Sequence, residues 1–177
     1  MTIQLFPKGR KEYSREAAAL LAECFPQAYL DCAEEEIGLC LEEERIAVMA
    51  EEGGHLIGFV GAIPQYGTTG WELHPLAVTE RWRGKGVGAE LVRFLERECA
   101  ARGGVTIYLG SDDEFEQTTL SNTDLYEDTF EKIRNIRNLN GHPYEFYQKQ
   151  GYQIVGVLPD VNGKGKPDIW MAKRIAD

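Results

Sequence analysis

The segment 81–88 reads Arg-Trp-Arg-Gly-Lys-Gly-Val-Gly and combines three glycines with three cationic side chains. Closely spaced glycines let successive backbone N–H groups point into one concavity. The apolar periodicity from Val87 to Arg102 predicts a helix, whose N-terminus adds unpaired N–H groups and partial positive charge. The whole chain has a formal net charge of -10, yet this segment holds no acid. The segment therefore predicts a site for phosphate or pyrophosphate.

The same glycines permit other interpretations. The spacing Gly-x-Gly-x-x-Ala at 84–89 also fits the dinucleotide fingerprint, but residues 79–83 separate it from the preceding strand, which that turn normally follows at once. A helix-opening turn without a ligand is the plainer alternative, and the clustered cations argue against it. Arg-x-x-Gly-x-Gly at 83–88 instead resembles the acyl-coenzyme A signature of the GNAT N-acetyltransferases.

A strand predicted from Gly70 to Val78 contains Pro75, which has no N–H to donate to a sheet. The strand should bulge or splay at this point and leave backbone N–H groups free to hold a ligand carbonyl. The N–H of Leu76 follows directly and is the candidate oxyanion donor. An edge strand with a harmless proline is the alternative.

Glu72 and His74 lie two residues apart on this strand, so we expect them to share one face with Leu76. Glu72 can hold an alkylammonium group and receive its proton, directly or through water. His74 is a second candidate for that role, or it orients Glu72, and a structural hydrogen-bonded histidine is the alternative. His55 and His142 are expected at the surface without a role.

Tyr147 belongs to an aromatic run that passes from a predicted helix, through Gly151, into a strand. A phenol can donate a hydrogen bond to a leaving thiolate, or protonate it. A packed aromatic residue is the alternative, because several aromatic side chains cluster here.

Four acids, Asp112, Asp113, Glu114 and Glu116, follow the strand predicted at 105–109. Such a group can contact several ammonium groups of one polycation, whereas a single exposed ion pair contributes about 0–1 kcal/mol. A solvated acidic loop is the alternative. We expect Asp112 and Asp113 to bind a cationic substrate.

Periodicity and turn residues predict the elements that position these residues. Strands are expected at 3–6, 45–50, 55–63, 70–78, 105–109, 152–158 and 169–173, helices at 15–25, 34–41, 87–102 and 143–150, and a helical stripe within 126–136. Ser14 is the expected N-cap of the first helix, and Gly53-Gly54 the turn of a hairpin. The order predicts an α/β fold with a mixed sheet and flanking helices.

Length and composition indicate a single domain over residues 1–177. The N-terminus has no signal-peptide core and the longest apolar run, 56–64, is short, so a cytoplasmic protein without a membrane partner is expected. The four cysteines lack metal-ligand spacing, so we expect reduced thiols and no metal. The acidic excess makes nucleic acid an unfavourable partner and suits a cationic one, although a solubilising surface also explains it.

Longer motifs carry a more specific resemblance. Ile63–Gly67, Gly70–Leu76, Thr106–Gly110, Asp124–Tyr126, His142–Tyr147 and Lys166–Lys173 closely resemble the chromosomal aminoglycoside 6'-N-acetyltransferases. The resemblance implies a GNAT-like, mostly antiparallel sheet with a splayed central strand. It also implies acetyl transfer from acetyl-coenzyme A to the 6'-amine of aminoglycosides, hence antibiotic resistance, and a homodimer.

The resemblance assigns roles residue by residue. Glu72 matches the amine-positioning acid, His74 its neighbour in the motif, and Tyr147 the tyrosine near the coenzyme sulfur. With Leu76 as the backbone donor, these form the expected catalytic set. The cofactor-binding set is Leu76, Val78, Arg83, Gly84, Lys85, Gly86, Val87 and Gly88, and the substrate-binding set is Trp71 and Glu72 with the charge-inferred Asp112 and Asp113.

Two other functions stay open at this point. One is a GNAT acetyltransferase whose substrate is a polyamine, a peptide or another cellular amine. The other is a non-catalytic acyl-coenzyme A-binding module that regulates a partner. Such a module would keep the segment 83–88 but would not need Glu72 or Tyr147.

Overall fold

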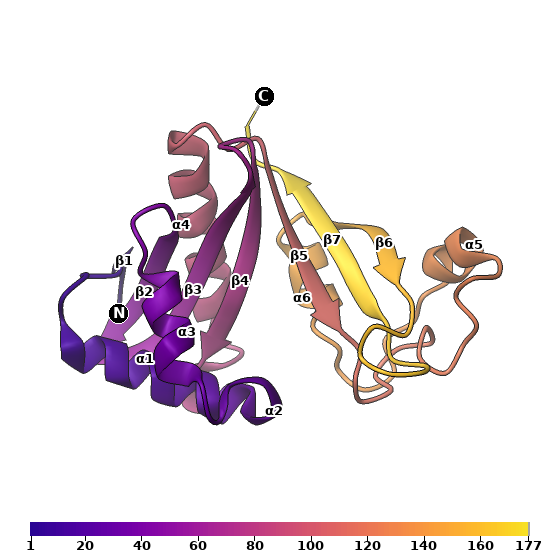
Figure 1. Cartoon of the computed structure of the whole chain (residues 1–177), viewed down its shortest axis with the longest axis horizontal. Helices are drawn as coiled ribbons and strands as arrows, with labels where there is room; N and C mark the ends of the chain where they lie inside the picture. Colours follow the sequence, from indigo (N-terminus) through magenta and orange to yellow (C-terminus); the bar gives the residue numbers. More distant parts are fainter. Residues whose placement is uncertain (177) are drawn as a thin grey trace. The chain divides into compact units, whose positions relative to one another are not determined.

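The computed structural model describes residues 1–176 and shows a mixed α/β fold (Figure 1). Seven strands form a mostly antiparallel sheet with one parallel pair, flanked by helices, which confirms the predicted fold class. Internal contacts divide the chain into two compact units. The first unit is Met1–Ile107 with the residues from Ile175 onward, and the second is Tyr108–Arg174.

The first unit holds four strands that pair antiparallel in sequence order. They are β1 (Thr2–Leu5), β2 (Ile46–Glu52), β3 (His55–Tyr66) and β4 (Gly70–Val78); the helices are α1 (Lys11–Cys24), α2 (Pro26–Tyr29), α3 (Ala33–Cys40) and α4 (Val87–Ala101), with a 3-10 turn, η1 (Glu80–Trp82). Helices α1 and α3 cover one face of these strands, and α4 covers the other (Figure 1).

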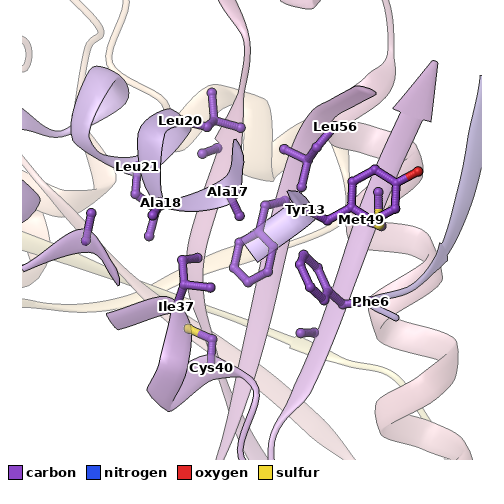
Figure 2. Packing of buried hydrophobic residues seen from close by; sticks show 14 residues of the cluster. Phe6, Tyr13, Ala17, Ala18, Leu20, Leu21, Ile37, Cys40, Met49 and Leu56 are labelled. Carbon is purple, nitrogen blue, oxygen red and sulfur yellow. The ribbon is translucent and has the colours of Figure 1, made fainter. Parts of the chain in front are cut away.

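Both faces of β2 and β3 are buried, which explains their nearly continuous apolar sequences. On one face, Met49 and Phe59 belong to one buried cluster with residues of α1 and α3. Figure 2 shows Met49 of β2 with Tyr13 of α1 and Ile37 of α3 in this cluster. On the other face, a Cβ at Gly58 would lie 2.9 Å from Leu91 of α4. The glycine therefore lets α4 approach the sheet closely.

The second unit contains most of β5 (Thr106–Asp112), together with α5 (Thr129–Arg134), α6 (Tyr144–Lys149), β6 (Gln153–Leu158) and β7 (Asp168–Arg174). Strands β6 and β7 pair antiparallel. A long polar segment between β5 and α6 carries α5. It is closed by an isolated bridge between Thr118 and Asn138.

Most predicted elements are confirmed with boundaries shifted by a few residues. The first helix starts at Lys11 with Arg10 as N-cap, so Ser14 lies within its first turn and the predicted cap was wrong. Sequence reasoning also missed α2, because four residues after a helix stop give little periodicity. Along residues 1–176, no helix combines the length and the apolar character needed to cross a bilayer.

Candidate active site

Strand β4 bulges at His74 and Pro75, which confirms the predicted interruption. The register between β3 and β4 shifts here, so these two residues oppose the single residue Gly61. The peptide bond that joins His74 to Pro75 is cis. A Cβ on Gly61 would lie 2.5 Å from the His74 carbonyl oxygen, so this close approach requires glycine.

The bulge shifts the alternation of side chains along β4 by one residue, so residues two or four positions apart across it no longer share a face. Glu72 pairs with Ile63, whereas Leu76 pairs with Val60. Directly paired residues share a face, and Ile63 and Val60 are an odd number of residues apart, so Glu72 and Leu76 lie on opposite faces. Glu72 and His74 share a face as predicted. The prediction that Leu76 lies on the same face was wrong, because the bulge adds one residue to β4.

The N–H of Leu76 points away from β3. Thr79 N–H donates to the Ile57 carbonyl at 3.0 Å, and the regular register makes Phe59 and Ala77 the next hydrogen-bonded pair. Leu76 therefore falls in a non-hydrogen-bonded pair, whose N–H and C=O groups point toward the opposite edge of β4. An oxyanion donor needs such a direction.

Residues of α2 and α3 hold the His74 ring. The Tyr29 hydroxyl lies 2.9 Å from His74 Nε2, and the two rings meet edge to face with centroids 6.3 Å apart. Glu36 Oε1 lies 3.7 Å from the same nitrogen. The His74 side chain nevertheless remains 40% exposed, so it is both oriented and accessible.

Glu72 is oriented by a residue that sequence reasoning missed. Gln65 Nε2 donates to Glu72 Oε2 at 2.7 Å. Gln65 lies two residues from Ile63, the partner of Glu72 in β4, and at a second register shift of β3, between Pro64 and Tyr66. The amide occupies Oε2, and a carboxylate can accept further donors through Oε1.

Trp71 does not fit its expected contact with substrate. Its side chain is 3% exposed, and its indole N–H donates to the Thr68 carbonyl at 2.8 Å. A Cβ at Gly104 would lie 2.9 Å from the Trp71 ring. The strand alternation that exposes Glu72 turns Trp71 into the core, so the expectation for Trp71 is corrected.

The segment 83–88 forms an open turn before α4. Gly84 and Gly86 have φ angles of +71° and +87°, and a Cβ on either would meet no described atom within 4 Å. Gly86 is the N-cap of α4, and within residues 1–176 no side chain caps this helix. The first N–H groups of α4 are thereby left to other acceptors, which suits an anion.

The side chains of this segment are used in different ways. Arg83 folds back: its Nε donates to the Val78 carbonyl at 3.0 Å, and its Nη2 donates to Cys24 Sγ at 3.2 Å. Lys85 Nζ lies 5.2 Å from the centroid of the Trp82 ring. Arg83 therefore fastens the turn to β4 and α1, and the backbone is left as the main set of anion donors.

Tyr147 lies on α6 in the second unit. Its side chain is 8% exposed and makes edge-to-face contacts with Phe146 and Tyr152, at centroid distances of 5.0 and 5.8 Å. Burial raises the pKa of Tyr147 well above its ordinary value. The phenol therefore stays protonated at neutral pH and can act as a hydrogen-bond donor.

Asp113 does not belong to an exposed acidic rim. It is 0% exposed, and its carboxylate accepts hydrogen bonds from Gln117 N–H at 2.7 Å and from Thr118 N–H and Oγ1 at 2.9 and 2.7 Å. Burial alone would raise the pKa of Asp113, but hydrogen bonds from this turn outweigh it and lower the pKa. The expected substrate contact is corrected for Asp113, whereas Asp112 is exposed.

His142 is 2% exposed, so its expected surface position was wrong. His142 Nδ1 accepts the Tyr144 N–H at 3.1 Å, and Nε2 lies 3.1 Å from the Asp112 carbonyl, to which it donates. Burial lowers the pKa of His142. The neutral ring thus ties the acidic turn to the start of α6. Within the described chain, no group of three or more His, Cys, Asp or Glu side chains could hold a metal ion.

Comparison with known proteins identifies the family. The Acetyltransferase (GNAT) family matches residues 14–131, and no curated protein matches the sequence. One similar solved structure is an aminoglycoside 6'-N-acetyltransferase complexed with coenzyme A, at 53% identity and a TM-score of 0.98 over 100% of this chain and 98% of that chain. Another is the aminoglycoside 6'-N-acetyltransferase from Enterococcus faecium, at 52% identity and a TM-score of 0.96 over 100% and 98% of the two chains. A type Ii aminoglycoside 6'-acetyltransferase is 44% identical, with a TM-score of 0.81 over 100% and 99%. The chain therefore belongs to the GNAT acetyltransferase family.

Proposed function

We propose that this acetyltransferase transfers the acetyl group of acetyl-coenzyme A to the 6'-amino group of aminoglycosides. The observation that carries the proposal is the 53% identity, over the whole chain, to an aminoglycoside 6'-N-acetyltransferase bound to coenzyme A. We also propose that residues 1–177 act as one acyl-coenzyme A N-acyltransferase domain. The family match at 14–131 supports this, because it crosses the division between the two units.

The open turn at 83–88 suits the pyrophosphate of the coenzyme. Its uncapped helix N-terminus offers backbone N–H groups, and its glycines leave room for close approach. Lys85 adds a charge nearby, whereas Arg83 supports the turn and Val87 contributes only its N–H, since its side chain is in the core. Leu76 and Val78 would contact the acyl end through N–H groups directed away from β3.

The amine reaches the site as an ammonium group and must lose a proton before it attacks. Glu72 would hold this group through Oε1, while Gln65 fixes Oε2. As the N–C bond forms, the thioester oxygen gains negative charge, for which the Leu76 N–H is the proposed donor. When the C–S bond breaks, the nitrogen loses a second proton and the sulfur gains one, and Tyr147 would donate at the sulfur.

Further aspects follow from the same proposal. Exposed Asp112 would attract other ammonium groups of the antibiotic. Tyr126 and Phe130 are 74% and 78% exposed, which supports a homodimer that covers this segment. We place the enzyme in the cytoplasm, where it would confer aminoglycoside resistance. Light scattering should give twice the 19.9 kDa chain mass, and expression in a susceptible bacterium should raise the inhibitory concentration.

Thiol release from acetyl-coenzyme A tests the activity itself. Two aminoglycosides that differ only in carrying an amine or a hydroxyl at 6' form the matched pair, and only the 6'-amine should be acetylated. A polyamine and a lysine peptide complete the panel. A higher kcat/KM for either of these would favour a cellular amine as substrate. Tight acetyl-coenzyme A binding without turnover of any amine would favour the regulatory module.

A further inference from the structure

Two oxygen atoms from neighbouring short helices lie near one nitrogen of His74, and the proposed acetyl transfer gives them no part. The Tyr29 hydroxyl of α2 is 2.9 Å from Nε2, and Glu36 Oε1 of α3 is 3.7 Å from it. The Glu36 side chain is only 18% exposed. A carboxylate this enclosed interacts mainly with the groups beside it.

Cys40 contacts this carboxylate. Its Sγ lies 3.7 Å from Glu36 Oε1, the same oxygen that faces His74. Burial, together with the neighbouring Glu36, raises the pKa of Cys40 to about 12, so the thiol stays protonated and can donate weakly. Cys40 Sγ also lies 3.6 Å from where a Cβ on Gly61 would stand, so it packs against the bulge.

We propose that Tyr29 and Glu36 are positioning residues that keep the hydrogen of the neutral His74 ring on Nε2. That hydrogen is donated to the Tyr29 oxygen beside the Glu36 carboxylate. In the opposite tautomer the Tyr29 hydroxyl would donate to Nε2, but the Nε2 lone pair would face the Glu36 carboxylate oxygen 3.7 Å away, which is electrostatically unfavourable. Nδ1 therefore carries the lone pair, on a side chain that is 40% exposed.

This inference rests on the proposed acetyl transfer to an amine, and it assigns His74 a step in it. Nδ1 takes one proton from the substrate ammonium, directly or through a water molecule. The freed electron pair on the substrate nitrogen then forms the N–C bond. Glu36 stabilises the resulting imidazolium at Nε2, and the imidazolium later returns the proton to solvent. Glu72 keeps the task of holding the ammonium group.

The tautomer can be measured without any substrate. The chain has three histidines, so 15N-labelling of the imidazoles and comparison with His74→Gln assigns the His74 signals. At about pH 8.5, where an ordinary histidine is neutral, we expect His74 Nδ1 to show the shift of a nitrogen without hydrogen. Glu36→Gln and Tyr29→Phe should move the ring toward a mixture of tautomers. A hydrogen on Nδ1 in the wild type, or no change in Glu36→Gln, would overturn the proposal.

Single-turnover acetylation of an aminoglycoside tests the consequence for chemistry. Glu36→Gln should slow the chemical step by about tenfold, a part of the ~10²–10⁴-fold that a positioned proton acceptor supplies. Tyr29→Phe should slow it less, since it keeps the ring that contacts Phe25 and His74. Glu35→Gln, an exposed acid of the same helix, is the matched control and should behave like the wild type.

The two measurements separate this inference from the proposed function. A wild type that acetylates no aminoglycoside contradicts the proposed function, and the tautomer of His74 then decides the positioning role alone. An active wild type whose rate is unchanged by Glu36→Gln contradicts the proton transfer to His74, whatever the tautomer. Acetyl-coenzyme A affinity, measured by calorimetry, should be the same in all of these variants.

Discussion

The open turn at 83–88 and the acidic turn at 112–118 both contain several charged residues in the sequence, but they differ in whether their polar groups are hydrogen-bonded within the protein. In the open turn, the backbone at the start of α4 has no side-chain cap within the described residues. In the acidic turn, Asp113 accepts three hydrogen bonds from its own loop. A group that its neighbours leave unsatisfied can bind a ligand, whereas one that they satisfy holds the fold together. Charge in a sequence does not distinguish the two.

Gly86→Asp should produce the largest effect, because it places a negative side chain at the N-cap that we assign to pyrophosphate. We expect acetyl-coenzyme A affinity to fall roughly a hundredfold or more, since a satisfied cap and a like charge both oppose the anion. Gly54→Asp is the matched control: this glycine has a similar φ of +85° and open space around it, in a hairpin turn. Equal calorimetric affinities for the two variants would show that the open turn does not hold the coenzyme.

Asp113→Asn should act on stability and spare the coenzyme. The amide cannot accept the same donors from Gln117 and Thr118, which leaves buried groups unsatisfied and costs about 2 kcal/mol of unfolding free energy. Urea unfolding measures this cost, with exposed Asp112→Asn as control. Loss of coenzyme affinity in a folded Asp113→Asn protein would contradict a purely structural role for Asp113.

The acidic turn should also weaken in mild acid through His142. Its folded pKa lies below its unfolded value of about 6.5, because the ring is buried neutral. Its stabilising contribution is therefore complete above about pH 6.5 and is lost as the pH falls toward the folded pKa. Asp113 adds a second loss of stability at lower pH. Because its pKa is lowered in the folded protein, its contribution is lost as the pH falls below its unfolded pKa of about 3.9.

Urea unfolding from pH 8 to pH 4 follows the loss of stability that His142 causes, and an imidazole titration by NMR reports the folded pKa of His142 directly. A folded pKa of His142 at or above the unfolded value of about 6.5 would contradict the buried neutral ring.

Asp112→Asn should give the smallest effect, because an exposed carboxylate contributes about 0–1 kcal/mol to an ion pair. We expect KM for an aminoglycoside with four amines to rise about twofold to fivefold, and KM for a mono-amine to stay constant. Added salt should reduce the difference. Glu127→Gln, an exposed acid of the same segment, is the control. Identical changes for both amines would remove Asp112 from the substrate site.

Sequence patterns predicted the fold well where periodicity was strong, as in α4 and in β4. They also predicted the open turn, since glycines at 84 and 86 need their positive φ angles. They failed where one extra residue shifts the side-chain alternation of a strand. The bulge places Leu76 and Glu72 on opposite faces of the sheet, and residue propensities do not predict that shift. They also failed for Asp113, whose carboxylate accepts hydrogen bonds from the residues four and five positions later in the chain. Tyr29, Glu36 and Gln65 lie at His74 and Glu72 only through tertiary structure.

Gly61 gives β3 a part in the reaction geometry although it offers the substrate nothing to touch. Because Gly61 has no Cβ, the His74 carbonyl oxygen can approach β3 closely at the bulge. The bulge in turn sets the face of the sheet on which Leu76 lies. Engineers who want this enzyme to accept another amine thus have two separate variables. In the proposed reaction the side chains at 72 and 74 contact the amine, whereas steric bulk at 61 acts on the bulge that sets the face of Leu76 relative to Glu72. A library built only from residues near the substrate would leave the second variable untouched.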